Sequence, residues 1–221
     1  MKRFEPRLPG RPVDGLPVGT ALSALHIYAV PNLALDTGLG TLVEACRRAM
    51  KPFPILALRD DLLHITLEMV ADSASEAVSS AERADLIAAL ETSLADIPSF
   101  TVLAGSPVAN KSGVFLDCWP DDNLNSLQQT VRSAVRKVRG PGAVIYSVGR
   151  PHCGLGYSYA EADSDPLQSA LRAISPSHAE FTVNRVVLVD VTFTLIETPL
   201  TPAWDFTFTP LHTIALIPAT P

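Results

Sequence analysis

The chain lacks the features that mark a membrane protein or a secreted disulfide protein. No stretch approaches the roughly 18 consecutive apolar residues of a membrane-spanning helix. The first residues carry charges and prolines in place of the apolar run of a signal peptide. The 3 cysteines are widely spaced and form no CxxC pair. These absences favour a protein with reduced thiols and a cytoplasmic location, with no membrane partner.

Positive charge is also scarce. The 17 Lys and Arg residues are outnumbered by 23 Asp and Glu residues, which leaves a formal net charge of −6. Proteins that bind long nucleic acids through their phosphates usually present a basic stripe. The one dense basic run, at 132–139, lies on a predicted helix, where a solvated helix face is the simpler interpretation. The balance favours a small phosphorylated substrate over extended nucleic acid, and it says nothing about oligomeric state.

Familiar metal and nucleophile motifs are missing as well. The sequence contains no HExxH, no HxH and no GxSxG. Cys153 follows His152 directly, but neighbouring residues of a strand point to opposite faces, so the two do not form a ligand or nucleophile pair. The sequence therefore predicts neither a metal nor a cofactor.

At 221 residues, 47% hydrophobic and 18% charged, the chain can bury a sizeable core. Residues 1–20 form a proline-rich N-terminal arm, and residues 21–221 are predicted to be a single bilobal domain. Hydrophobic periodicity predicts helices at 35–50, 79–96, 121–139 and from about 163 to 175. It predicts strands at 22–30, 64–70, 100–103, 114–118, 152–159, 181–190, 191–196 and 204–217, the last broken at Pro210. This order indicates an α+β fold with helices outside antiparallel sheets.

Two of these strands carry a histidine on their polar face. In the strand at 64–70, His64 and Thr66 share one face while Ile65 points to the core. The second strand begins with His152, and alternation places Gly154, Gly156 and Ser158 on the same face as the imidazole. On the strand at 22–30, His26 and Tyr28 also share a face, which makes both candidates for the lining of a common cleft.

Gly154 admits three interpretations, because it stands where the first strand has Thr66. A neighbouring backbone could approach closely at this point. Alternatively, the missing side chains at 154 and 156 could widen the pocket for an unusual substrate. Thirdly, the second half-site could have decayed into one that binds phosphate and catalyses poorly. Arg150, just before the strand, is a candidate for a compensating cation and equally for a surface residue.

These residues resemble the two-histidine phosphoesterase superfamily, which includes 2′-5′ RNA ligase-like proteins and cyclic phosphodiesterases. The hallmark of that family is two copies of His-x-Ser/Thr-x with an apolar fourth residue. Residues 64–67 match it in full, whereas residues 152–155 carry Gly154 at the Ser/Thr position. The segments at 25–31, 150–152 and 157–158 resemble other parts of the family pattern, so the likeness covers roughly residues 20–217.

The resemblance implies two pseudo-symmetric lobes whose histidine strands face each other across a central cleft. It also implies metal-independent cleavage, or in reverse ligation, of a phosphodiester. In either direction His64 and His152 would be the acid–base pair, with Thr66 and Gly154 at the substrate phosphate. Opening a 2′,3′-cyclic phosphate needs a base for water and an acid for the departing ribose oxygen, and two imidazoles can divide those roles near neutral pH. Which histidine is acid and which is base stays open.

The sequence therefore predicts a phosphodiesterase for a small 2′,3′-cyclic or 2′-5′-linked nucleotide. The alternative is a catalytically weak protein of the same fold that binds a nucleotide or an RNA end. Gly154 separates the two, because its missing hydroxyl weakens the second half-site.

Overall fold

The computed structural model describes residues 1–8 and 11–219, and in this part of the chain nine strands join in one sheet. The strands are β1 (Ala21–Ala29), β2 (Ile55–Ala57), β3 (Ile65–Met69), β4 (Phe100–Ala109), β5 (Gly113–Trp119), β6 (His152–Ser158), β7 (His178–Val183), β8 (Arg185–Ile196) and β9 (Ala203–Ala215). The helices are α1 (Thr37–Met50), α2 (Ser80–Leu94), α3 (Asp121–Arg139) and α4 (Asp165–Arg172). The strand order is β7-β4-β5-β6-β3-β1-β8-β9, with β2 paired to β6.

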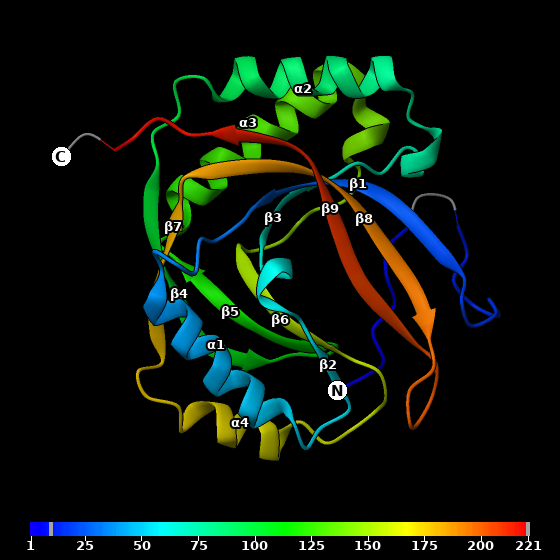
Figure 1. Ribbon diagram of the computed structural model, residues 1–221, viewed down its shortest axis with the longest axis vertical. Helices are drawn as coiled ribbons and strands as arrows, with labels where there is room; N and C mark the ends of the chain where they lie inside the picture. The colour runs from blue at the N-terminus through cyan, green and yellow to red at the C-terminus, as the bar shows by residue number, and fades with distance from the viewer. Residues whose placement is uncertain (9–10, 220–221) are drawn as a thin grey trace.

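The sheet divides into two lobes, each with its own pair of helices (Figure 1). One lobe holds β7, β4, β5, β6 and β2, and α1 and α4 pack against it. The other holds β3, β1, β8 and β9, and α2 and α3 pack against it. The lobes join where β3 meets β6, at the residue pair Ile65 and Cys153. The α+β class, with antiparallel strands, outer helices and the two histidine strands at the centre, is thereby confirmed, and the sheets of the two lobes are continuous with each other.

The long helices form where the periodicity predicts them. On α2, Leu86, Leu90 and Leu94 recur every fourth residue and are fully buried. The helix starts with a capping box, in which Ser79 and Glu82 satisfy each other's backbone N–H groups. Apolar spacing and capping residues are local signals, so they are readable without the tertiary structure.

The predicted strand boundary at 190–191 is wrong. The chain breaks at Asn184, between β7 and β8, and β8 continues through Asp190. The break occurs there because β7 pairs with β4 in one lobe while β8 pairs with β1 in the other. Asp190 remains in the strand because it pairs with Leu25 of β1 on one side and with Thr209 of β9 on the other. Its carboxylate lies 3.7 Å from the Arg83 guanidinium.

The predicted break at Pro210 is also wrong, because β9 runs unbroken through it. Pro210 lies opposite Val189, where the register between β8 and β9 shifts. β9 is an edge strand, and a proline is tolerated at such a place because no ladder N–H is needed. β4 continues to Ala109, beyond the predicted end at 103, and the three-residue strand β2 was not predicted.

The N-terminal arm has no helix or strand at residues 1–8 and 11–20 and is held against the end of β6. The Phe4 N–H donates to the Ser158 carbonyl over 2.9 Å, and the Ser158 hydroxyl donates to the Lys2 carbonyl. Leu8 is buried in the core. Backbone pairing and apolar burial therefore tie the arm to the β6 lobe.

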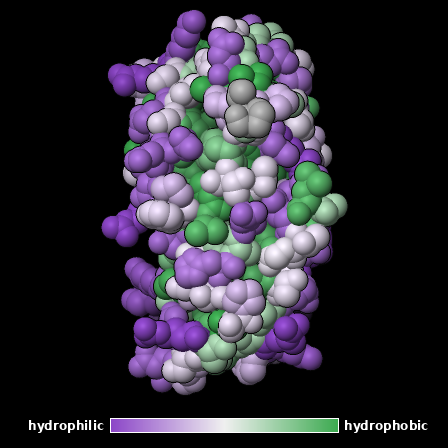
Figure 2. Space-filling view, turned by 90° about the vertical axis from the view of Figure 1, so that its left-hand side faces the viewer, coloured by the Kyte–Doolittle hydropathy of each residue, from purple (hydrophilic) through white to green (hydrophobic). Residues whose placement is uncertain are grey.

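The left-hand face of the molecule is mainly hydrophilic, around a central strip of hydrophobic residues (Figure 2). The edge strand β7 lies on this side in Figure 1. Its exposed His178 and Glu180 alternate with buried residues such as Phe181. Charged side chains on an exposed edge discourage pairing with another sheet. None of the helices in the described part of the chain is both long and apolar enough to cross a membrane.

Candidate active site

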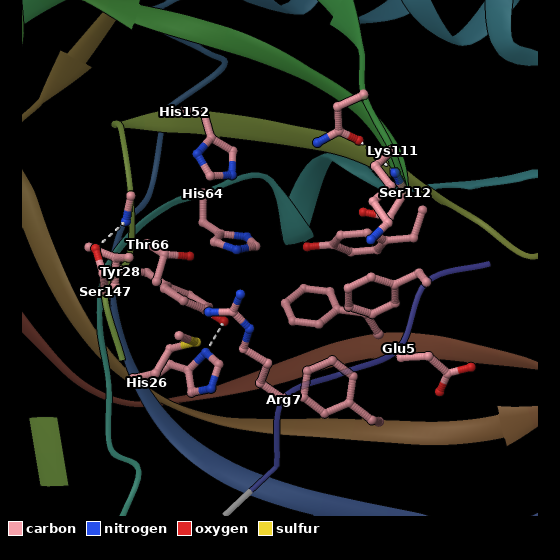
Figure 3. Close-up of a pocket in the computed structure, with 18 of the residues that line it drawn as sticks. Glu5, Arg7, His26, Tyr28, His64, Thr66, Lys111, Ser112, Ser147 and His152 are labelled. Atoms are coloured by element: carbon pink, nitrogen blue, oxygen red, sulfur yellow. Dashed lines mark hydrogen bonds between the residues drawn. The ribbon is translucent and has the colours of Figure 1, made fainter. Parts of the chain in front are cut away.

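A cavity of about 720 Å³ lies between the lobes, and both histidines of the two motifs line it. A recess of about 50 Å³ shares His64, Thr66 and His152 with the cavity and also touches Gly154 and Gly156. Residues far apart in sequence thus meet around one space, as the two-motif pattern implies. Figure 3 shows His152 above His64, with Thr66 to one side.

The other candidates from the sequence divide between the cavity and the surface. His26 and Tyr28 line the larger cavity, on the same face of β1. Arg150 is exposed and does not line either space. Of the two interpretations of Arg150, the structure therefore agrees with the surface residue and not with a cation in the cleft. Only the backbone carbonyl of Arg150 takes part in the site, where it hydrogen-bonds to His152.

The two histidines are held in the same way. His64 Nδ1 lies 2.7 Å from the Leu62 carbonyl oxygen, and His152 Nδ1 lies 2.8 Å from the Arg150 carbonyl oxygen. A carbonyl oxygen only accepts, so Nδ1 carries the proton in both rings. Each imidazole therefore leaves Nε2 free for chemistry in the cavity.

His64 lies in a dry, aromatic environment. Its ring stacks on Tyr28, with centroids 3.9 Å apart, and lies 5.2 Å from the centroid of Phe206. Burial lowers the pKa of His64 to about 4, and the nearby charge of His152 acts in the same direction. At neutral pH His64 is uncharged, so it can accept a proton at Nε2.

His26 and Tyr28 form a second polar pair in the wall of the cavity. His26 Nδ1 lies 2.6 Å from the Tyr28 hydroxyl. Burial lowers the pKa of His26 to about 3 and raises the pKa of Tyr28 well above its ordinary value. Both groups stay uncharged near pH 7, so the pair holds the ring of Tyr28 beneath His64 and adds no charge to the cavity.

A β-bulge interrupts each histidine strand at the fourth residue of its motif. β3 pairs with β1 at Thr66 and again at Glu68, so Leu67 has no partner. An extra residue reverses the alternation beyond it, because side chains of a strand alternate with period 2. Met69 therefore faces the cavity, while Glu68 is fully buried on the other side.

The bulge in β6 is the counterpart of the one in β3. β6 pairs with β5 at Gly154 and again at Gly156, so Leu155 has no partner there. Tyr157 consequently lines the cavity, whereas Ser158 is buried and bonded to the arm. The prediction from simple alternation that Ser158 faces the cleft is therefore wrong, and Tyr157 lines the cavity in its place.

The two glycines of β6 differ in how much space surrounds them. A Cβ at Gly156 would lie 2.7 Å from Ile55 Cγ2 and 2.8 Å from the Leu56 carbonyl oxygen, so close approach of β2 requires glycine. A Cβ at Gly154 would meet nothing closer than the Tyr157 hydroxyl at 3.7 Å. Close backbone approach therefore explains Gly156 and does not explain Gly154.

The N-terminal arm supplies a part of the site that the sequence reasoning missed. Three cations of the arm line the cavity, namely Lys2, Arg3 and Arg7, together with the carboxylate of Glu5. A fourth cation, Lys111, comes from the turn between β4 and β5. Figure 3 shows Arg7 extending toward the histidines. The available signal was a cluster of positive charge in the first seven residues of an acidic chain. This local charge makes the cavity suitable for an anion.

Aromatic contacts hold the arm over the site. The ring of Phe4 stacks on Tyr157, with centroids 4.1 Å apart and planes inclined by 22°. The Arg7 guanidinium lies 5.7 Å from the centroid of the Tyr146 ring and forms no ion pair with a described residue.

Among residues 1–8 and 11–219, no group of three or more His, Cys, Asp or Glu side chains could hold a metal ion.

Comparisons with known proteins point to one family. A family model described as the 2′-5′ RNA ligase superfamily matches residues 36–192. The fold is similar to that of TT0787 from Thermus thermophilus, at 17% identity and a TM-score of 0.58, over 87% of this chain and 97% of that one. It is also similar to LigT from E. coli, at 15% identity and a TM-score of 0.56, over 90% and 99%. The MHV ns2 PDE domain matches at 12% identity and a TM-score of 0.50, over 86% and 99%. No curated protein sequence matches the chain.

Proposed function

Because the chain belongs to the 2′-5′ RNA ligase superfamily, we propose that it is a phosphodiesterase for a small 2′,3′-cyclic or 2′-5′-linked nucleotide. The observation that carries this proposal is the matched anchoring of His64 and His152. Each ring donates from Nδ1 to the carbonyl two residues before it and presents Nε2 to one shared cavity. Two imidazoles fixed in this way are suited to general acid–base catalysis.

The lowered pKa of His64 supports a division of roles. Being uncharged at neutral pH, His64 takes a proton at Nε2 from a water molecule as the water oxygen attacks phosphorus. The bond from phosphorus to one ribose oxygen breaks, and His152 donates its Nε2 proton to that oxygen. The products are a ribose hydroxyl and a phosphomonoester, and proton exchange with solvent restores both rings. Each imidazole contributes on the order of 10²–10⁴ in rate.

The surrounding groups suit the phosphate. Thr66 shares the recess with both histidines and can donate its hydroxyl to a non-bridging oxygen. The cations of the arm and Lys111 attract a negatively charged ligand into a protein whose net charge is −6. LigT from E. coli, which has a similar fold, has been crystallised with 3′-AMP and with phosphate, and this supports a phosphate-containing ligand for the present chain.

The test is turnover of a panel of 2′,3′-cyclic nucleotides and 2′-5′-linked dinucleotides in the presence of EDTA. Product release from at least one substrate, with the same rate before and after chelation, is expected. Activity that disappears with EDTA and returns with a stoichiometric metal would overturn the metal-independent mechanism.

Gly154 favours a second candidate function, in which the protein binds a nucleotide or RNA end and turns it over poorly. A second motif without its hydroxyl has one donor fewer for the phosphate. This alternative predicts binding of nucleoside 2′- or 3′-monophosphates without hydrolysis of any member of the panel.

A further inference from the structure

The cavity contains a hydroxyl that neither motif supplies. We propose that the Tyr157 hydroxyl replaces the one missing at Gly154 and donates a hydrogen bond to the substrate phosphate from the β6 lobe. This inference rests on the proposed function. It makes the two lobes equivalent in chemistry, with Thr66 donating from one side and Tyr157 from the other.

The distance between the two positions supports the substitution. An ideal Cβ built on Gly154 lies 3.7 Å from the Tyr157 hydroxyl oxygen. A serine hydroxyl is one bond beyond Cβ, so a serine at 154 and the tyrosine at 157 would serve the same small volume. That volume is the recess also lined by His64, Thr66 and His152.

The fold brings Tyr157 to this place by a specific device. Without the unpaired Leu155, regular alternation would point residue 157 away from the face that carries His152. The bulge turns the tyrosine into the cleft. Phe4 of the arm then stacks on the ring at 4.1 Å, and Phe206 lies against it with centroids 6.1 Å apart. Packing from the arm and from β9 limits where the Tyr157 hydroxyl can go.

The hydroxyl is also in the right chemical state. Burial raises the pKa of Tyr157 to about 12, so the proton stays on the oxygen at any working pH. No other described residue hydrogen-bonds to this hydroxyl, and it faces the recess. A protonated, unengaged hydroxyl beside two imidazoles is a donor for a phosphate oxygen.

The experiment is a double-mutant cycle between positions 157 and 154. Tyr157→Phe removes only the oxygen, and we expect kcat/KM to fall about 10- to 150-fold, the loss of one hydrogen bond to a charged oxygen. Adding Gly154→Ser to that variant should recover most of the loss, since a Cβ fits at 154. Gly154→Ser alone should change kcat/KM little, because the tyrosine already fills the role.

Two controls separate this role from a structural one. Tyr159→Phe changes a tyrosine that does not line either space and should leave kcat/KM unaltered. Binding of inorganic phosphate, followed by NMR titration, should weaken in Tyr157→Phe and not in Tyr159→Phe. Thermal unfolding of each variant verifies the fold, and a packing defect at 157 would not be repaired by a serine at 154.

The outcomes distinguish this inference from the proposed function. If the wild type turns over a panel substrate but Tyr157→Phe changes neither turnover nor phosphate binding, the hydroxyl assignment is overturned and the proposed function stands. If the wild type hydrolyses nothing while Tyr157→Phe still weakens phosphate binding, the proposed function fails and the assignment stands. Recovery of kcat/KM when Gly154→Ser is added to Tyr157→Phe supports both the hydroxyl assignment and the proposed function.

Discussion

The ring of Tyr28 lies beneath the imidazole of His64, with centroids 3.9 Å apart and planes inclined by 22°. Tyr28 excludes water from one face of the His64 ring, and its hydroxyl is hydrogen-bonded to His26. Desolvation disfavours the charged imidazolium, which is why the pKa of His64 falls to about 4. The stacked Tyr28 ring thus helps to keep His64 neutral, which is the form that can accept a proton.

The pH dependence should reflect this lowered pKa. A base must be deprotonated to act, so activity should persist as pH falls below 6.5 and decline only near pH 4. The measurement is kcat/KM from pH 3 to 8, with circular dichroism at each pH to verify folding. An acidic limb centred near pH 6.5 would contradict the assignment of His64 as the base.

Both histidines should be needed for turnover. His64→Gln and His152→Gln should each lower kcat by roughly 10²-fold or more, because each removes one partner of the acid–base pair. The matched control is His178→Gln, since His178 is exposed at the start of the edge strand β7 and does not line the cavity. Near-full turnover in either cleft variant would rule out the paired mechanism.

The arm should act in substrate binding through Arg7. Arg7→Gln should raise KM about fivefold with little change in kcat, as expected for losing an attraction on the order of 1 kcal/mol to an anion. The effect should shrink as salt is added. Arg11→Gln is the control, because Arg11 belongs to the same arm but pairs with Glu76 and does not line the cavity. Equal effects of the two variants would remove Arg7 from the site.

An ion pair between the buried Glu68 and the half-buried Arg132, beneath the first motif, should matter for stability. The carboxylate of Glu68 is almost completely buried and lies 2.7 Å from the Arg132 guanidinium of α3. Arg132→Met should lower the free energy of unfolding by about 3–5 kcal/mol, because it leaves the buried charge unpaired. Adding Glu68→Met should restore the part of that loss that is due to the unpaired carboxylate, but not the bonds that Arg132 donates to the Val144 and Tyr146 carbonyls. Chemical denaturation measures both, with the exposed Arg136→Met on the same helix as the control.

The bulk of the architecture was predictable because it depends on local patterns. Apolar spacing placed three long helices, and alternation placed His64 and Thr66 together on a polar face. Alternation found the second histidine in the same way, but it did not place Tyr157 in the cleft. A bulge such as the one at Leu155 arises from pairing with β5, and pairing between distant strands leaves no periodic signal in either one.

The sequence by itself determined the α+β class, the two histidine strands and the apolar faces of the helices, because these depend on neighbours within a few residues. Only the tertiary structure decided which side chains beyond each histidine face the cleft. It also brought the cationic arm over the site, distinguished the crowded Gly156 from the open Gly154, and buried His64 against Tyr28. Register, close approach and desolvation all arise from contacts between segments distant in sequence, and hydrophobic spacing carries no information about them.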